Sequence, residues 1–117
     1  MKLLNEYTYI VKKSKFIGYY YSLSTLDEVE NILSFFKKEH KKATHVTYGY
    51  IFDNNQKKFD DGEPGGTAGM PILKILNEND LNRHLIVIVR YFGGTKLGAG
   101  GLIRAYLTTA KEVIKKS

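Results

Sequence analysis

Hydrophobic and polar positions alternate along the chain in a way that separates strands from helices. Residues 6–12 and 15–23 are rich in Tyr, Ile, Val and Phe with a short junction between them, which predicts two antiparallel strands. A capping-box spacing begins at Thr25, and the apolar residues after it recur at helical intervals, so a helix is predicted there. Residues 43–52 alternate again and are expected to form a third strand.

The second half of the chain begins with a long polar segment, residues 53–69, whose glycines predict a loop. Pro71 suits the first turn of a helix, and the apolar spacing after it continues that helix as far as residues 77–80. Residues 85–89 are continuously apolar, which is typical of a central strand covered on both faces. After the glycine-rich residues 93–101, a last amphipathic helix is predicted.

The predicted order of elements is ββαβαβα. We therefore expect an α+β fold, a two-layer sandwich in which helices cover a single sheet. The length of 117 residues is that of one domain, residues 1–117.

The composition excludes several classes of chemistry. The chain has no cysteine, which excludes a disulfide scaffold, a thiolate metal site and a cysteine nucleophile. Polar residues follow Lys2 almost at once, and the longest apolar run, residues 85–89, is far shorter than a membrane span. We expect a cytoplasmic protein with no signal peptide and no membrane partner.

Positive charge is concentrated near the end of the sequence. The formal net charge is +6, yet residues 1–80 hold 11 basic and 11 acidic side chains. Residues 81–117 hold seven basic side chains and one acid, so the whole excess belongs to this segment. It is expected to face an anionic partner, unless these charges simply form the solvated side of a C-terminal helix.

A strand-to-helix turn with five glycines in residues 93–101 is the main candidate site. Glycines let backbone N–H groups approach an anion closely, and the helix start adds the positive end of its dipole. Neither the nucleoside-triphosphate loop nor the dinucleotide fingerprint is present. The alternative is that the glycines serve only turns and close packing. The expected phosphate-binding residues are Arg90, Gly93, Gly94, Lys96, Gly98, Gly100, Gly101 and Arg104.

Secondary candidates lie in an acidic segment and on a strand. Asp60, Asp61 and Glu63 place three carboxylates within four residues. They could bind a hard cation, act as acid and base, pair with the basic segment, or form a solvated turn. His45 could line a pocket, although a structural role is more common for such a histidine. No metal-ligand spacing is found, and neither a metal nor a cofactor is expected.

Two long segments resemble the hallmark motifs of the IMPACT (YigZ-like) family. They read DDGEPGGTAGMPIL at residues 60–73 and RYFGGTKLGAGGLIRAY at residues 90–106. Residues 13–17 and 43–45 are similar to weaker motifs of the family, and they contain the secondary candidates Lys15 and His45. The resemblance implies the fold of the second domain of small-subunit ribosomal protein five, shared with domain four of elongation factor G and with a class of small-molecule kinases.

The resemblance also bears on domain organisation. Eukaryotic members act as translational regulators and carry an N-terminal RWD domain, whereas longer bacterial members carry a ferredoxin-like C-terminal domain. We expect this chain to be a single IMPACT-type domain with neither addition, so only the activity of the shared domain carries over.

Three functions remain open from the sequence. The first is a non-enzymatic module that binds RNA or the ribosome in translation control, with the glycine-rich turn holding phosphate. The second is an enzyme acting on a small phosphorylated compound or nucleotide, with a carboxylate as base or metal ligand. The third is a protein-interaction domain with a protein partner in translation control.

Overall fold

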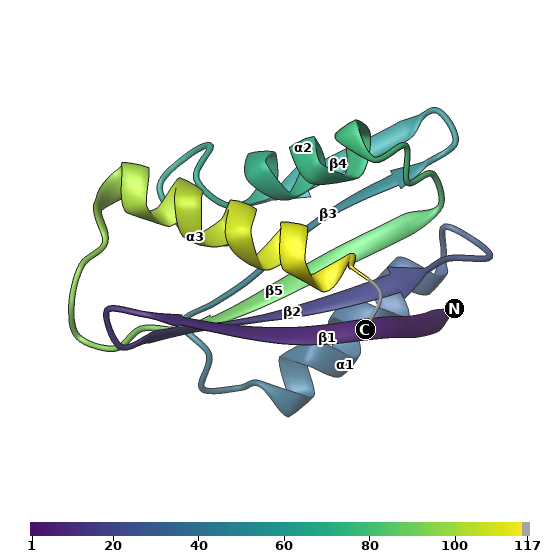
Figure 1. Cartoon of the computed structure of the whole chain (residues 1–117). Helices are drawn as coiled ribbons and strands as arrows, with labels where there is room; N and C mark the ends of the chain where they lie inside the picture. Colours follow the sequence, from purple (N-terminus) through teal and green to yellow (C-terminus); the bar gives the residue numbers. More distant parts are fainter. Residues whose placement is uncertain (116–117) are drawn as a thin grey trace.

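Five antiparallel strands in the order β1-β2-β5-β3-β4 form one sheet, on which three helices pack (Figure 1). The computed structural model describes residues 1–115. The strands are β1 (Lys2–Val11), β2 (Ser14–Ser22), β3 (His45–Phe52), β4 (Asn55–Phe59) and β5 (His84–Tyr91). The helices are α1 (Glu28–Glu39), α2 (Gly69–Glu78) and α3 (Gly98–Val113). None of these helices is long and hydrophobic enough to cross a membrane, as judged over residues 1–115.

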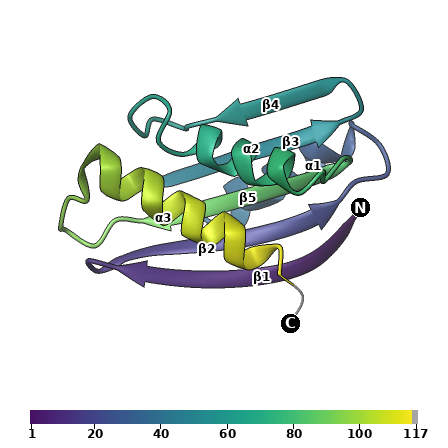
Figure 2. The same ribbon diagram turned by 45° about the horizontal axis from the view of Figure 1, so that its top comes forward.

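Helices cover both faces of the sheet. Helices α2 and α3 lie side by side on one face, and α1 lies on the other (Figures 1 and 2). The central strand β5 feeds both cores: Ile86 and Ile88 join α2 and α3, while Leu85, Val87 and Val89 join α1. The α+β class and the doubly covered central strand are therefore confirmed. The two-layer description is corrected to three layers, because α1 packs alone on its own face.

Strand β4 lies within the segment that the sequence predicted to be a loop. It pairs with β3 from Tyr48 opposite Phe59 to Phe52 opposite Asn55, after a turn at Asp53 with a positive φ of 54°. All five of its residues are exposed, so its side chains show no alternation of buried and exposed positions. Backbone hydrogen bonds to β3 define this edge strand, and the side-chain pattern therefore gave no sign of it.

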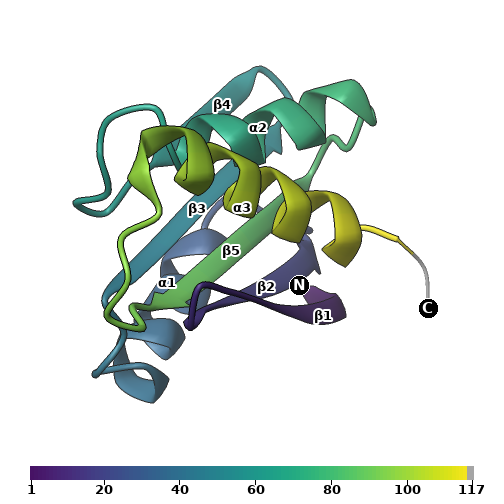
Figure 3. The ribbon, with the colours of Figure 1, turned by 60° about the vertical axis from the view of Figure 1, so that its left-hand side comes forward.

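Strand register places four connecting segments at one end of the sheet, here called the loop end. Val11 pairs with Ser14 across the β1–β2 turn, and β2 then runs antiparallel to β5. His45, the first residue of β3, pairs with Arg90 near the end of β5. The β1–β2 turn, the start of β3, the loop before α2 and the turn before α3 all meet there (Figure 3).

Helix α2 packs closely on β3 because Gly49 has no side chain. A Cβ atom at Gly49 would lie 2.9 Å from Cγ2 of Ile72, which is fully buried. We expect Gly49→Ala to lower the free energy of unfolding by about 1–3 kcal/mol, since added atoms overpack a filled core. Urea denaturation measures this change. The matched control is Gly65→Ala, where a Cβ meets no atom within 4 Å, and its effect should stay within about 0.5 kcal/mol. Equal effects of the two substitutions would contradict this packing account.

Candidate functional site

The carboxylate of Asp60 accepts hydrogen bonds from backbone amides of the protein itself. Its Oδ1 accepts hydrogen bonds from the backbone N–H groups of Ala68 and Gly69, at 3.2 and 2.8 Å, and Oδ2 accepts one from Gly66 at 3.0 Å. Ala68 and Gly69 are the cap and the first residue of α2. Asp60 therefore satisfies the N-terminus of α2 and places a negative charge at the positive end of its dipole.

Asp61 attaches the same loop to β3. Its Oδ2 accepts a hydrogen bond of 2.7 Å from the N–H of Val46, and its carbonyl oxygen lies 2.7 Å from Nδ1 of His45. Gly62 follows with a positive φ of 84° and brings the loop against the His45 ring. Two of the three carboxylates in the acidic segment thus act as acceptors for backbone amides. Across residues 1–115, no three His, Asp or Glu side chains converge as metal ligands.

Glu63 lies at the centre of a buried polar network and is only 6% exposed. Nη1 of Arg90 lies 2.9 Å from each carboxylate oxygen, and the Tyr106 hydroxyl donates to Oε2 at 2.5 Å. Burial raises the pKa of the Tyr106 hydroxyl far above its usual range, and the hydrogen bond to the negative Glu63 raises it further. The network joins the loop before α2 to β5 and to α3.

His45 completes this network on the β3 side. Its Nε2 lies 3.3 Å from Oε1 of Glu63, while its Nδ1 faces the carbonyl oxygen of Asp61. Because a carbonyl oxygen only accepts, Nδ1 must donate to it. His45 therefore helps to attach the loop before α2 to β3. This is the structural role that the sequence analysis gave as the alternative to lining a pocket.

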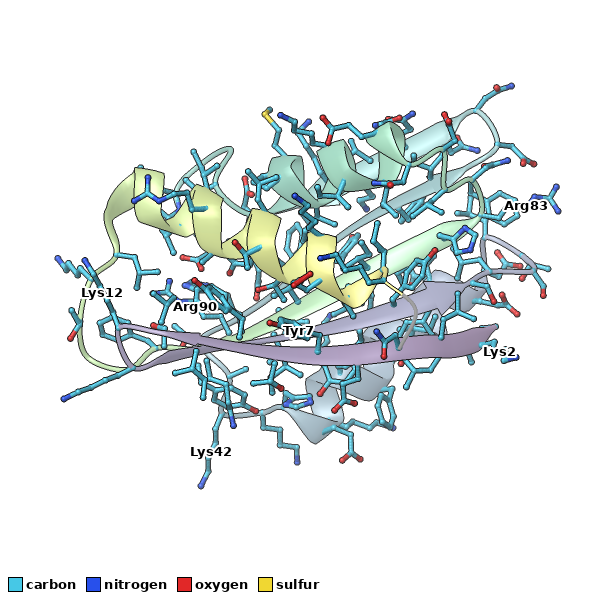
Figure 4. The ribbon with its side chains drawn as sticks, in the orientation of Figure 1. Lys2, Tyr7, Lys12, Lys42, Arg83 and Arg90 are labelled. Carbon is cyan, nitrogen blue, oxygen red and sulfur yellow. The ribbon has the colours of Figure 1, made fainter. Side chains whose placement is uncertain are left out.

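Arg90, which the sequence analysis named as an expected phosphate-binding residue, is buried. It is 5% exposed, and its Nη2 donates to Oγ of Ser14 at 3.3 Å. Its guanidinium lies between the rings of Phe16 and Phe92, 5.4 and 5.5 Å from their centroids. Figure 4 shows Arg90 between α3 and the sheet. Arg90 was expected to bind phosphate, and this is corrected, because its guanidinium is buried and paired with Glu63.

Gly93 also serves packing instead of ligand approach. A Cβ atom there would lie 2.0 Å from the carbonyl oxygen of Lys13, so the β1–β2 turn sits directly on this glycine. Its N–H lies 3.4 Å from Oγ of Ser14. The next two glycines differ: Gly94 and Gly98 have positive φ values of 93° and 75°, and a Cβ at either would meet no atom within 4 Å. Beyond Gly93 the turn faces outward.

The start of α3 is open, in contrast to that of α2. Its N-cap residue is Leu97, which makes no side-chain capping hydrogen bond. Within residues 1–115, no side chain accepts from the first four amides of α3, which also lack partners inside the helix. A Cβ at Gly100 would meet only Nη1 of Arg104, at 3.5 Å. We call the group Gly94, Lys96, Gly98, Gly100 and Arg104 the open turn; Gly101, half-buried against Leu97, lies behind it.

Exposed lysines lie in the connecting segments of the loop end. Within residues 1–115, none of them forms an ion pair with a carboxylate, and Nζ of Lys15 lies 5.1 Å from the Tyr91 ring centroid. Figure 4 shows Lys12 and Lys42 pointing outward there, while Lys2 and Arg83 lie at the opposite end. The sequence analysis identified Lys96 and Lys15 and missed the other lysines of this end. Their position in the segments that precede β2 and β3 could have indicated them. The exposed lysines of this end are Lys12, Lys13, Lys15, Lys41, Lys42 and Lys96.

Removal of the Glu63 carboxylate should destabilise the fold strongly. We expect Glu63→Ala to lower the free energy of unfolding by about 3–5 kcal/mol, because Arg90 would keep a buried charge without its partner. Tyr106→Phe, which removes one hydrogen bond to the carboxylate, should cost about 1.5–3 kcal/mol. Chemical denaturation followed by circular dichroism measures both. The control is Glu39→Gln, at an exposed acid, with an expected change within about 0.5 kcal/mol. A Glu63→Ala protein as stable as the control would contradict the network.

Comparison with known proteins identifies relatives along nearly the whole chain. The IMPACT family member YvyE of Bacillus subtilis is 44% identical over 115 residues, which cover 96% of this chain and 53% of that protein. The IMPACT family member YigZ of Escherichia coli is 37% identical over 101 residues, covering 82% of this chain and 50% of that protein. This chain thus spans about half the length of the curated relatives it matches.

Solved structures match the fold as well. One crystal structure of a hypothetical protein superimposes with a TM-score of 0.90 and 30% sequence identity, covering 94% of this chain and 56% of that one. The two-domain translational regulator Yih1 matches with a TM-score of 0.56 and 22% identity, covering 96% of this chain and 45% of that one. The profile described as the Impact N-terminal domain matches residues 12–114. The chain therefore belongs to the IMPACT family, as the two glycine-containing motifs indicated.

Proposed function

We propose that this chain is a non-enzymatic module of translation control that binds RNA, free or in the ribosome, through phosphate groups held at the open turn. The context comes from similar proteins: Yih1 is described as a translational regulator, and a protein IMPACT homolog of Dictyostelium discoideum is 37% identical over 111 residues. A cytoplasmic location fits such a role.

The observation that supports this proposal is the separation of charge at the loop end. Asp60 and Asp61 accept from backbone amides, and Glu63 is buried against Arg90. The lysines of the same end and Arg104 on α3 are exposed. The three carboxylates are therefore engaged by donors of the protein itself, whereas the cations are exposed. Such a surface attracts a polyanion such as the phosphate backbone of RNA.

The open turn supplies directional donors within this field. The amides at the start of α3 point along the helix axis toward solvent, and the helix dipole adds positive charge at the same place. The side chains of Lys96 and Arg104 flank these amides in sequence, and Arg104 lies beside Gly100. Amides and point charges of this kind contact phosphate oxygens rather than base edges, so we expect binding with little preference for sequence.

The same geometry argues for binding rather than catalysis. An enzyme acting on a phosphorylated compound needs a base or a metal ligand beside the phosphate. The three carboxylates that the sequence offered for this role are engaged as acceptors on the inner side of the loop. The protein-interaction alternative has a separate surface, which is considered below.

Loss of either cation of the open turn should weaken RNA binding in a salt-dependent way. Lys96→Ala and Arg104→Ala should each remove one phosphate contact and lower the slope of log affinity against log salt by about 0.7. Fluorescence anisotropy with a labelled single-stranded RNA at several salt concentrations measures the slope. Lys2→Ala is the matched control, because Lys2 lies at the opposite end of the sheet (Figure 4). Affinity that does not change with salt, or equal loss in the control, would contradict the proposal.

The β1–β2 turn allows stability and binding to be separated. Lys12 and Lys13 both have positive φ, 46° and 67°, a conformation that favours Asn-Gly and strains lysine. We expect the double variant Lys12→Asn, Lys13→Gly to raise the free energy of unfolding by about 1 kcal/mol, because the turn strain is relieved. It should also weaken RNA binding, since two cations leave the loop end. Denaturation and anisotropy on the same sample test both effects, and unchanged RNA affinity would show that the turn lies outside the interface.

A further inference from the structure

A groove of about 750 Å³ runs between α2 and α3 on the outer side of the helical layer, away from the sheet. Its floor is apolar. Ile75 of α2 is 5% exposed, and Leu107 of α3 and Ile114 just beyond it are partly buried against the core. These side chains present hydrophobic surface to the groove, a property that phosphate binding at the open turn does not use.

The rim of the groove is mostly basic. Lys74, Arg104, Lys111 and Lys115 line it, against a single lining acid, Glu78. Lys74 pairs loosely with Glu78 at 3.8 Å, with both side chains more than half exposed. Lys115, just beyond the end of α3, pairs with Glu112 of that helix. Arg104 and Lys111 form no ion pair within residues 1–115, so the charge of the rim favours an acidic occupant.

The lining positions of α3 define the shape of that occupant. The lining residues from this part of the chain are Arg104, Leu107, Thr108, Lys111 and Ile114, and each lies three or four residues from another member of the set. They form one stripe along the helix, about 15 Å long at a rise of 1.5 Å per residue. A straight stripe with apolar positions between cations matches an amphipathic helix of about three turns.

We propose that this groove is a docking site for an acidic amphipathic helix of a protein partner. Apolar residues of the partner, spaced three and four apart, would cover Ile75, Leu107 and Ile114. Its Asp and Glu side chains would face Arg104 and Lys111. The apolar floor distinguishes this surface from the open turn, which consists of glycines and two cations. The inference is independent of RNA binding, although Arg104 borders both surfaces.

Selection from a display library of random 16-residue peptides tests the proposal on the purified chain. We expect the enriched peptides to be acidic and to repeat apolar residues at helical spacing. Peptides made from them should shift the amide NMR signals of α2 and α3. Lys111→Glu should weaken their binding roughly tenfold or more, because like charges would then face each other, while Lys111→Arg should retain it. The control Lys41→Glu, at an exposed lysine outside the groove, should leave peptide binding unchanged.

Several results would overturn the docking site. They are the absence of enriched peptides, enrichment of basic or non-periodic sequences, and binding that Lys111→Glu does not affect. Groove signals that shift with the concentration of the chain itself would assign the surface to a second copy. Groove signals away from the open turn, those of Lys111 and Ile114, that shift with RNA would assign the groove to nucleic acid. Failure here is distinguishable from failure of the proposed function, because Lys96→Ala should change RNA affinity and leave peptide affinity intact.

Discussion

The buried carboxylate of Glu63 is the constraint on which the loop end depends. It accepts from Arg90 on β5 and Tyr106 on α3, and it lies beside His45 on β3. One charged group thus ties the loop before α2 to two strands and a helix that are distant in sequence. An ion pair of this kind contributes little net stability relative to a well-packed apolar core, yet loss of one partner is costly. It therefore specifies where the loop must lie.

The position of the loop before α2 determines which charged groups of the loop end are left to bind an anion. Glu63 neutralises Arg90 inside the protein, and Asp60 and Asp61 accept from backbone amides, so all three carboxylates of the acidic segment have partners within the protein. The α2 N-terminus is satisfied by Asp60, whereas that of α3 has no side-chain cap. The two helix starts differ because an acid precedes one and glycines precede the other. The positive field of the loop end and its open amides follow from this arrangement.

Much of the fold was predictable from side-chain patterns, and the site was predictable only in part. Alternation and helical spacing indicated every element except β4, whose exposed residues carry no pattern. The glycine-rich turn was found, but glycine spacing does not distinguish Gly93, packed under Lys13, from Gly94, which faces open space. Composition likewise cannot tell a buried Arg90 from an exposed Lys96. Those distinctions depend on contacts between segments far apart in sequence, such as Ser14 and Glu63 with Arg90.

Anion binding at the open turn can be observed in a crystal of the chain grown in sulfate, since sulfate mimics a phosphate group. We expect an ordered anion on the first amides of α3, within hydrogen-bond distance of Lys96 or Arg104, with Glu63 and Arg90 still paired. An anion seated instead on Arg90, with Glu63 displaced from it, would contradict the account. A glycine-rich turn folded back to cap its own helix, leaving no free amides, would contradict it equally.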